Sequence, residues 1–499
     1  MKIAIVGGGT IGWIASYYLS VSHDCINIST KEIPTIGVGE GTTGKFLSML
    51  PIDKTKLMLE LNALPKLGIR FEGWSKTRDY FWSPIDGTST ANYYIDYSTF
   101  ASYFTDYTPL TCSEYTFLME SNKTNYYVDG NKLICNWDHH GLHIDAFKTA
   151  EYFKKLSLEN DVTTVEAKVI KVNRKDNKIK SIDLDNGLTI EADVFIDCSG
   201  FSRVLNSHLE WIDYSEYLPV NSALVYSSQD NDRKSYTVAK AMNYGWSWEI
   251  PTRNKIGRGY VYSDKYCSEE DILKELGDVE KIKSIKFRSG RIKNFIDSNC
   301  VSVGLSSGFL EPLQATSIHC ALIQLELFFY SFPDNESLYN KQSVSRYNEL
   351  ISNLYDDMRD FISLHYTGGK TDTKFWQDIS CTERVNEILK VCNSRLTRSF
   401  DFNHVPGTVK QESWNPILAG LGHFKKCLIT ETFAADNANM AWWLGKIDEF
   451  NKSVSDQTQN YLTTDQLNAI LSEEQRLGMT LKAPWCGWDL SPAQFLTSD

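Results

Sequence analysis

A glycine-rich turn directly after the first apolar run constrains the fold of this chain more than any other segment. Lys2–Val6 has the composition of a buried parallel strand. The pattern G-x-G-x-x-G follows at once with Gly7, Gly9 and Gly12, and the apolar residues from Trp13 onward have helical spacing. A strand, a glycine turn and a helix in this order predict the βαβ unit of a dinucleotide-binding domain.

Each glycine of the turn has a physical role. Gly7 allows a tight turn, Gly9 lets the backbone approach a pyrophosphate, and Gly12 lets the helix pack closely on the strand. The residues expected at the nucleotide are Gly7, Gly8, Gly9, Thr10, Ile11 and Gly12. A second apolar run over 25–28 completes the unit, but Ser29 stands where an acidic ribose ligand is usual. The motif therefore predicts the pyrophosphate contact and not the ribose contact.

The composition narrows the class of protein. A chain of 499 residues with 42% hydrophobic residues can bury a large core and form two packed parts. The net charge of -12 argues against a nucleic-acid partner. The sequence has no run of apolar residues long enough for a membrane span and no signal-peptide pattern at its start. The eleven cysteines lack C-x-x-C spacing, which favours reduced thiols. We therefore expect a soluble cytoplasmic protein with no membrane partner; whether it is a homo-oligomer stays open.

Three further segments have small-residue turns suited to a bound nucleotide. Residues 34–42 contain three glycines within six positions, so their backbone must take unusual angles or approach a ligand closely. Residues 192–201 form an apolar strand that ends in a small-residue turn. Residues 300–318 contain an alternating strand, a Gly/Ser turn and a helix that starts near 314–316. The start of that helix offers free backbone amides and a partial positive charge, which suits an anion.

Two other segments draw attention by their side chains. Trp246 and Trp248 lie two residues apart in an expected strand, so both indoles face the same side, and Pro251 ends that strand. By itself the pair is typical of a buried aromatic face. Lys66 lies in the half-apolar segment 65–71, where a lysine by composition alone would extend its charged end to the surface.

These segments, in this order, resemble the flavin-dependent halogenases of the tryptophan halogenase family over residues 3 to about 425. The resemblance implies an α/β (α+β) fold with mixed sheets: an FAD-binding, flavin-monooxygenase-like domain over 1–330 and a mainly helical substrate-side domain over 331–499, packed on it. It also implies reduced FAD, a halide ion and a small aromatic substrate. Because no second nucleotide fingerprint for NADPH follows residue 12, a separate flavin reductase is expected to supply the reduced FAD.

The resemblance also implies roles for particular residues. The segment with Gly37, Val38, Gly39 and Glu40 would cover the flavin, although Glu40 could equally cap the helix that follows. Further cofactor contacts would come from Val169, Gly304, Leu305 and Ile318, and the amides of Thr316 and Ser317 would hold the halide. Trp246, Trp248, Ile250 and Pro251 would line a tunnel that separates the substrate from the flavin.

Lys66 matches the lysine of the family that directs hypohalous acid to the substrate. An ammonium can hydrogen-bond hypohalous acid and polarise its halogen, whereas a neutral amine can form a haloamine. Burial that lowers the pKa of Lys66 would keep both routes open. The chain departs from the family at Gln314, which replaces a glutamate, and Glu311 is near enough in sequence to be a substitute. A weaker activating pair predicts a preference for iodide and bromide over chloride.

The later half of the chain carries the substrate side. Apolar spacing predicts a long helix that ends near His365, with that histidine satisfied at the helix end and Asp356-Asp357 on a salt-bridged face. No set of His, Cys and acidic residues has metal-site spacing. Residues 404–415 lack the clamp that holds free tryptophan in the family, so a phenol, indole or pyrrole is expected instead.

Two alternatives to a halogenase stay open at this point. A flavin-dependent aromatic hydroxylase would stack its substrate on the flavin and would not need Lys66. The change at Gln314 would also fit a flavin-binding protein that does not turn over.

Overall fold

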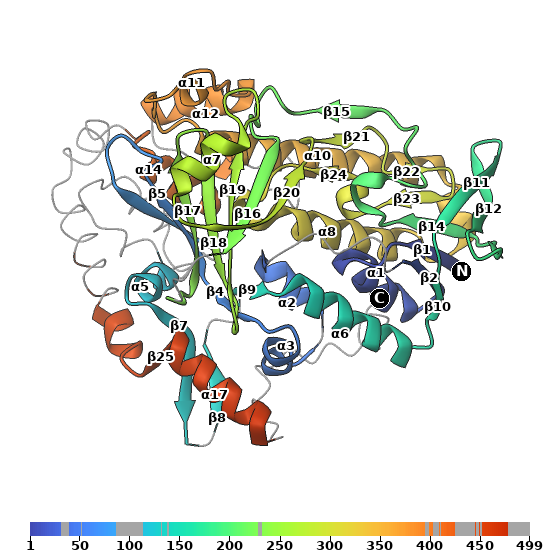
Figure 1. Ribbon diagram of the computed structural model, residues 1–499, viewed down its shortest axis with the longest axis horizontal. Coiled ribbons are helices and arrows are strands. Elements are labelled where there is room, and N and C mark those ends of the chain that lie inside the picture. The colour runs from blue at the N-terminus through green and yellow to red at the C-terminus, as the bar shows by residue number, and fades with distance from the viewer. Residues whose placement is uncertain are drawn as a thin grey trace.

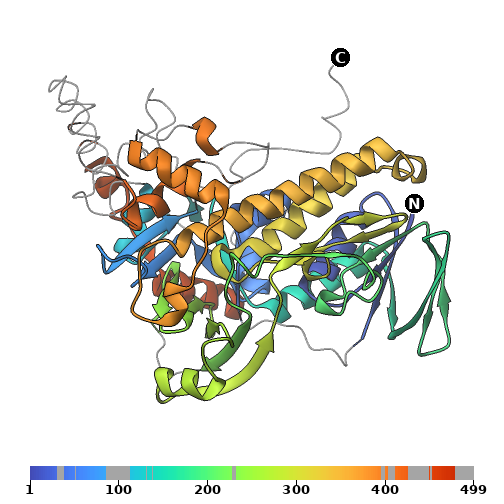
Figure 2. The same cartoon turned by 90° about the horizontal axis from the view of Figure 1, so that it is seen from above.

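Two large sheets form the body of the molecule (Figure 1). The computed structural model describes residues 1–30, 39–50, 52–85, 113–130, 132–136, 139–227, 232–394, 399–402, 409, 411–424, 445, 449 and 452–477. The two sheets lie side by side, and helices pack against both of them (Figures 1 and 2). This mixed α/β architecture confirms the predicted fold class.

The first sheet contains the predicted βαβ unit. Its strands, in spatial order, are β10 (Thr163–Glu166), β2 (Asp24–Ser29), β1 (Lys2–Val6), β14 (Val194–Asp197), β23 (Cys300–Ser302) and β22 (Ile296–Asp297). All of these neighbours run parallel except β22 and β23. Helix α1 (Thr10–Ser20) connects β1 to β2 and packs against α6 (Ala146–Glu159) and α8 (Thr316–Ser331). The apolar residues of β1 are buried on both faces, as a central parallel strand requires.

The second sheet contains the tryptophan pair. Its order is β20 (Glu280–Lys286), β16 (Ser222–Ser227), β19 (Ile256–Tyr262), β18 (Gly245–Pro251), β17 (Tyr236–Met242), β5 (Gly68–Glu72) and β6 (Tyr80–Pro84). Strands β17 and β5 run parallel, and the other neighbours run antiparallel. Pro251 is the last residue of β18, as predicted.

A small sheet of β3 (Glu40–Gly41), β9 (Gly141–Ile144) and β4 (Leu64–Lys66) joins two segments that are distant in sequence. Strand β9 lies in the middle, with Gly41 opposite His143 on one side and Lys66 opposite Gly141 on the other. The end of the glycine-rich segment 34–42 and the predicted catalytic lysine are therefore separated by one strand.

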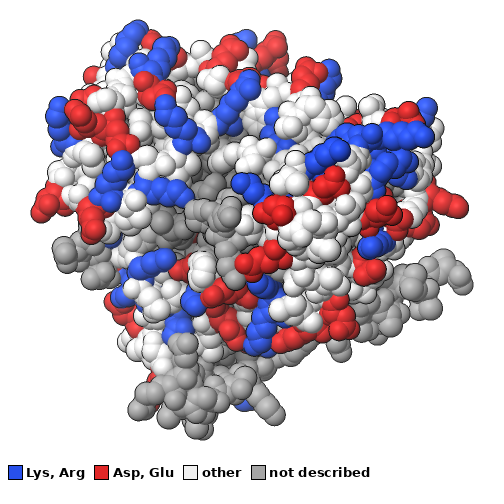
Figure 3. Space-filling model, turned by 45° about the vertical axis from the view of Figure 1, so that its right-hand side comes forward, with Lys and Arg blue, Asp and Glu red and all other residues white. Residues whose placement is uncertain are grey.

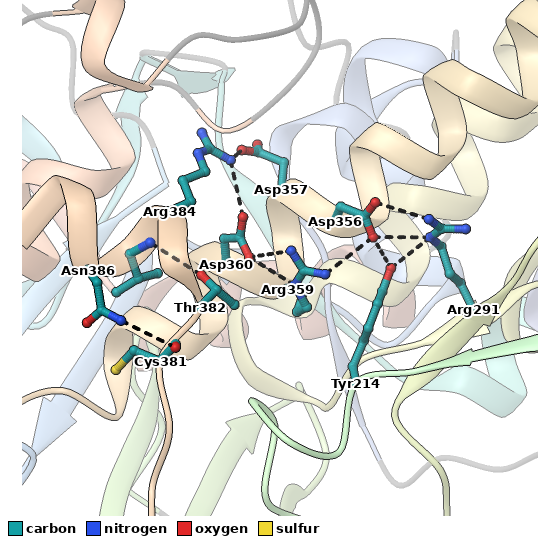
Figure 4. A network of polar contacts seen from close by, with 11 residues as sticks. Tyr214, Arg291, Asp356, Asp357, Arg359, Asp360, Cys381, Thr382, Arg384 and Asn386 are labelled. Carbon is teal, nitrogen blue, oxygen red and sulfur yellow. Dashed lines mark hydrogen bonds and ion pairs between the residues drawn. The ribbon is translucent and has the colours of Figure 1, made fainter.

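Helix α10 (Lys341–His365) runs beside α8 across the molecule (Figures 1 and 2). Asp356 accepts from Arg291 at 3.0 Å, and the buried Asp357 pairs with Arg384 (Figure 4). The predicted salt-bridged face is confirmed. It attaches α10 to the segments on both sides.

The remaining elements cover the two sheets. Small sheets are formed by β11 (Val169–Lys175), β12 (Lys178–Leu184) and β13 (Thr189–Ile190); by β15 (Trp211–Asp213), β21 (Gly290–Ile292) and β24 (Gly308–Phe309); and by β25 (Tyr461–Thr463), β7 (Lys123–Asp129) and β8 (Lys132–Cys135). The other α-helices are α2 (Gly44–Met49), α3 (Lys54–Glu60), α5 (Glu114–Glu120), α7 (Glu269–Leu276), α9 (Asn335–Leu338), α11 (Lys374–Gln377), α12 (Glu383–Ser394), α13 (Ser399–Phe402), α14 (Gln411–Gly420) and α17 (Thr464–Leu477). Short 3-10 turns are η2 (Gly200–Ser202), η3 (Gly304–Ser306) and η4 (Leu313–Ala315).

The described residues after 331 are mainly helical, and they include a strand, β25, that the sequence did not predict. Strand β25 pairs antiparallel with β7, so residues near 460 extend a sheet that begins more than 300 residues earlier. On the face shown in Figure 3, basic and acidic side chains are interspersed rather than gathered into one field. Among the described residues, no helix has the length and apolar character needed to cross a membrane.

Candidate active site

The glycines of the first turn form a cradle at the start of α1. Gly7 has a φ of 143°, and a Cβ there would overlap the carbonyl oxygen of Cys198. A Cβ on Gly12 would overlap the carbonyl oxygen of Gly7, so the helix can pack this closely only with glycine. By contrast, a Cβ on Gly9 would meet no atom within 4 Å. Gly9 is also the N-cap of α1, and it has no side chain that could accept hydrogen bonds from the free amides in the first turn of that helix. Open space beside unsatisfied amides fits a pyrophosphate.

Segments from three parts of the chain meet at this cradle. The amide of Cys198 donates to the carbonyl of Val6 at 2.9 Å, and the amide of Val303 donates to the carbonyl of Asp197 at 3.0 Å. Asp197 is buried, which raises the pKa of its carboxyl, but it accepts from the amides of Ser199 and Leu205 and so holds the turn after β14. The carboxyl ends of the central parallel strands thus surround one space, where nucleotides bind in folds of this kind.

Two further predicted cofactor segments follow strands of the same sheet: Gly304 and Leu305 come after β23, and Val169 comes after β10. A Cβ on Gly304 would lie 3.3 Å from the side chain of Ile11, so the first and last nucleotide segments touch. Leu305 follows in η3, and Ile318 is buried in the first turn of α8. Val169 starts β11, just after Ala167 donates its amide to Ser29 at the end of β2. Gly37 and Val38 lie outside the described residues.

The start of α8 has the features of an anion site. The helix begins at Thr316, as predicted, and its N-cap Ala315 gives no side-chain cap to the first amides, which include those of Thr316 and Ser317. The hydroxyl of Thr316 is buried and has no hydrogen-bond partner among the described residues. Gln314 and Ala315 have φ angles of 63° and 57°, a left-handed backbone conformation that residues other than glycine rarely adopt. Unsatisfied donors behind a strained turn fit a bound halide.

Lys66 points into the protein. It is 2% exposed, so the surface position that composition alone suggests is wrong. Within the described ranges, no hydrogen bond or ion pair reaches its Nζ. A Cβ on Gly41 would lie only 3.0 Å from that nitrogen, so the end of the glycine-rich segment lies directly against the amine. Burial lowers the pKa of Lys66 to about 7, so both protonation states are populated near neutral pH.

A buried histidine lies behind the lysine. His143 hydrogen-bonds Thr237 through Nε2 at 2.8 Å, and its Nδ1 has no partner in the described part of the chain. Burial and the charge of Lys66 both hold the pKa of His143 well below its usual value. The charge of Lys66 thus disfavours protonation of His143, so the lysine is the more basic of the two groups.

The tryptophan pair forms one wall of the interior between the two sheets. Trp246 and Trp248 are both buried, with ring centroids 6.2 Å apart. Gly259 on the neighbouring strand leaves the space that the Trp248 ring fills. Ile250, further along β18, lies against Gly39: a Cβ on Gly39 would be 3.5 Å from the Ile250 side chain. The wall therefore touches the glycine-rich segment that also touches Lys66.

Glu311 holds this wall to the segment before α8. One of its oxygens accepts from the indole N–H of Trp246 at 3.1 Å, and both accept from the hydroxyl of Tyr366, at 2.9 and 3.0 Å. Burial raises the pKa of Glu311 to about 8, although these hydrogen bonds oppose the shift. No ion pair joins Glu311 to Lys66 among the residues described, and its role as a substitute charge partner stays a prediction.

Gln314 is held by two elements that sequence reasoning did not connect to it. Its Nε2 donates to Ser83 on β6 at 3.1 Å and contacts Nε2 of His365 at the end of α10 at 2.9 Å.

Glu40 lies in the glycine-rich segment and is partly buried. Burial and the negative charge of Asp145 raise the pKa of Glu40 to about 7. It does not cap α2: the N-cap is Thr43, whose hydroxyl bonds His319 at 2.9 Å.

Comparison with known proteins decides which family this arrangement belongs to. A family model described as tryptophan halogenase matches residues 2–431. The chain belongs to the tryptophan halogenase family. It is 30% identical to the tryptophan 7-halogenase RebH of Lentzea aerocolonigenes, over 93% of this chain and 96% of RebH. It is 30% identical to the tryptophan 6-halogenase SttH of Streptomyces toxytricini, over 76% of this chain and 80% of SttH.

A solved structure extends the likeness to the fold. The structure of Tar14, a tryptophan C-6 flavin-dependent halogenase (chlorinase) from taromycin biosynthesis, superposes with a TM-score of 0.86. It is 26% identical to this chain, and the match covers 94% of this chain and 99% of Tar14. The resemblance inferred from separated sequence motifs is confirmed at the level of the family and the fold.

Proposed function

We propose that this chain is a flavin-dependent halogenase that directs hypohalous acid through Lys66 onto an electron-rich aromatic substrate. The observation that carries the proposal is the buried Lys66 amine, which has no partner among the described residues and lies against the end of the flavin-side segment at Gly41. A structural lysine in such a place would be paired, because an isolated buried charge is costly.

The cofactor would lie along the cradle, where Gly9 leaves open space, and beside the segments at Cys198 and Gly304. Reduced FAD, when bound there, would supply with O₂ the two-electron oxidation that turns halide into hypohalous acid. Gly39 and Glu40 would cover it. The delivery of reduced FAD by a separate reductase and the cytoplasmic location stay predictions.

The residues of this chain would divide the remaining work. The amides of Thr316 and Ser317 hold the halide at the start of α8, where the helix dipole favours an anion. The wall of Trp246 and Trp248, with Ile250 and Pro251, keeps the aromatic substrate away from the flavin, so that hydroxylation does not compete. Glu311 fixes that wall through its bond to Trp246.

At the far end of the passage, Lys66 acts on hypohalous acid. As an ammonium it donates a proton to the oxygen of hypohalous acid while the oxygen–halogen bond breaks and the aromatic carbon takes the halogen. Water leaves, and the proton that the carbon then loses returns to the amine. As a neutral amine it would take the halogen first and pass it on. Because its pKa is about 7, the pH profile separates the two. A rate that falls as pH rises through 7 indicates the ammonium, and a rate that falls as pH drops indicates the amine.

Gln314 bears on the choice of halide. With a neutral amide where the family has a carboxylate, the protonated state of Lys66 lacks a charge partner at that position. We therefore propose that iodide and bromide, which are easier to oxidise, are used before chloride. Competition between equal concentrations of the halides, with products counted by mass spectrometry, tests this, and a clear preference for chloride would contradict it.

The experiment for the function itself is a screen of phenol, indole and pyrrole substrates with each halide, in the presence of FAD, O₂ and an added flavin reductase. A halogenated product that disappears in Lys66→Met is the expected result. A hydroxylated product that does not depend on halide or on Lys66 would indicate an aromatic hydroxylase. Flavin binding without any product would indicate a protein that does not turn over.

A further inference from the structure

The side-chain amide of Gln314 stands between two elements that come from distant parts of the chain. Ser83 contributes a hydroxyl from β6, and His365 contributes a ring nitrogen from the last turn of α10. Both are buried. The backbone of Gln314 is left-handed, a conformation that persists only when the surroundings impose it.

The hydrogen bonds of His365 fix which of its nitrogens carries the proton. Its Nδ1 lies 2.9 Å from the carbonyl oxygen of Phe361. A carbonyl can only accept, so Nδ1 must bear the hydrogen. Burial lowers the pKa of His365 to about 4, so the ring is neutral and Nε2 carries a lone pair. That lone pair can accept from the NH₂ group of Gln314 and cannot donate to its carbonyl oxygen.

The amide of Gln314 therefore has one orientation. Both hydrogens of its NH₂ group are used, one toward Ser83 and one toward His365. The carbonyl oxygen is turned away from both, and it has no hydrogen-bond partner in the described part of the chain. Gln314 is partly exposed, and it lies two residues before the amide of Thr316 at the start of α8.

The surroundings of His365 keep its ring neutral. Phe71 from β5 and Phe361 from α10 each lie 5.0 Å from it between ring centroids, and Trp74 lies 6.4 Å away. The influences on its pKa are burial and the backbone carbonyls of Phe361 and Ile362, and no charged side chain of the described residues contributes.

We propose that His365 is a positioning residue that holds the carbonyl oxygen of Gln314 toward the substrate side of the active site. The site then offers the N–H or O–H group of an aromatic substrate a fixed, neutral acceptor, in the place where the family has a carboxylate. This proposal rests on the proposed function for the identity of the ligand, but the orientation of the amide does not depend on it.

A glutamate at position 314 would break the match. A carboxylate opposite the lone pair of Nε2 would be repelled unless His365 gained a second proton. Gln314→Glu therefore forces His365 to become an imidazolium near neutral pH, and a reversion to the family residue changes the histidine as well.

The orientation is tested by nitrogen-15 NMR of the histidines in the full-length protein, with the His365 signal assigned from its loss in His365→Gln. We expect the Nδ1–H tautomer and no titration above pH 5 in the natural sequence. In Gln314→Glu, the titration of His365 should move to pH 6.5 or above. An Nε2–H tautomer, or a titration of His365 that is the same in both proteins, would overturn the proposal.

The functional consequence is tested with indole as the probe, bromide, FAD, O₂ and an added reductase. His365→Phe keeps the aromatic packing and removes the acceptor, so bromoindole formation should fall at least tenfold. His365→Gln keeps an acceptor and should recover to within about threefold of the natural sequence. Equal loss in both variants, with unchanged thermal unfolding, would contradict the positioning role. If the natural sequence itself yields no brominated product, the proposed function fails on this probe, and the NMR result alone decides the orientation.

Discussion

The two ends of the active site differ in how their polar groups are satisfied. At the nucleotide end, Asp197 is buried but accepts hydrogen bonds from backbone and side-chain donors, and the glycines are required by close backbone contacts. At the reaction end, which includes both the halide site at the start of α8 and the lysine, the hydroxyl of Thr316 and the amine of Lys66 have no partners within the described ranges. Close backbone packing therefore determines which residues the first end needs. The second end keeps unsatisfied side-chain groups for ligands, at a cost in stability.

The largest effect expected from this difference concerns Lys66→Met. Halogenated product should fall by about 100- to 10,000-fold, the range typical of a lost acid–base group. The protein should nevertheless become more stable, by up to about 4 kcal/mol at pH 7, because a pKa near 7 instead of 10.5 reports the cost of burying the charge. Denaturant unfolding measures the stability, and mass spectrometry measures the product.

The sign of the pH dependence provides a further check on this variant. Unfolded Lys66 titrates near 10.5 and folded Lys66 near 7, so the unfolded chain holds more protons between these values. The stability of the natural sequence should therefore rise with pH across that window, and the advantage of Lys66→Met should shrink toward pH 10. Lys45→Met is the matched control, since Lys45 is paired with Glu326 at 2.6 Å and its removal should give no gain. A loss of stability in Lys66→Met would mean that the amine is satisfied.

The nucleotide end is sharpened by comparing two glycine variants. In Gly12→Ala the new Cβ would overlap the backbone of Gly7, so we expect a loss of about 1–3 kcal/mol in unfolding free energy. In Gly9→Ala the new Cβ meets no protein atom within 4 Å, so stability should be nearly unchanged while FAD affinity falls. Equilibrium unfolding and flavin fluorescence titration measure the two quantities. Equal FAD affinity in Gly9→Ala and the natural sequence would place the pyrophosphate elsewhere.

The same difference explains what the sequence could predict. The βαβ unit was predictable because the role of Gly12, which packs against Gly7, is steric and local, and a strand and a helix flank the two glycines. The start of α8 at Thr316 was predictable for the same reason. The burial of Lys66 was not, since it depends on β9, which lies more than 70 residues later in the chain.

The contacts that shape the chemistry also escaped the sequence. Glu311 is near Gln314 in the chain, which suggested a shared role, yet its oxygens are engaged by Trp246 and Tyr366. The bond between Gln314 and His365 spans 51 residues and two elements. No local pattern encodes such a pairing, and the resemblance to a family, which indicated Gln314 and Trp246 as site residues, did not include His365.

A more moderate effect is expected where the two ends meet, at Gly41. In Gly41→Ala the new Cβ would lie 3.0 Å from the Lys66 amine, which is the mobile end of a long side chain and can move aside. We therefore expect normal folding and FAD binding, with product formation reduced by about tenfold to 100-fold because the amine is displaced. Gly44→Ala is the control, since its Cβ would make an ordinary 3.5 Å contact with His139. If both variants retain full activity, the position of the amine is not critical.

The smallest effect concerns the strained turn before α8. Ala315 has a φ of 57°, and glycine adopts this conformation without the penalty that a Cβ brings. Ala315→Gly should therefore raise the unfolding free energy by about 1 kcal/mol. Ala321→Gly, in the regular part of the same helix, should lower it by a similar amount or more. The same Ala315→Gly change should raise the bromide concentration needed for half-maximal rate, because a looser turn holds the amides of Thr316 and Ser317 less firmly. A loss of stability equal to that of Ala321→Gly would show that the turn stores no strain, and the contrast between the two ends of the site would then rest on Lys66 alone.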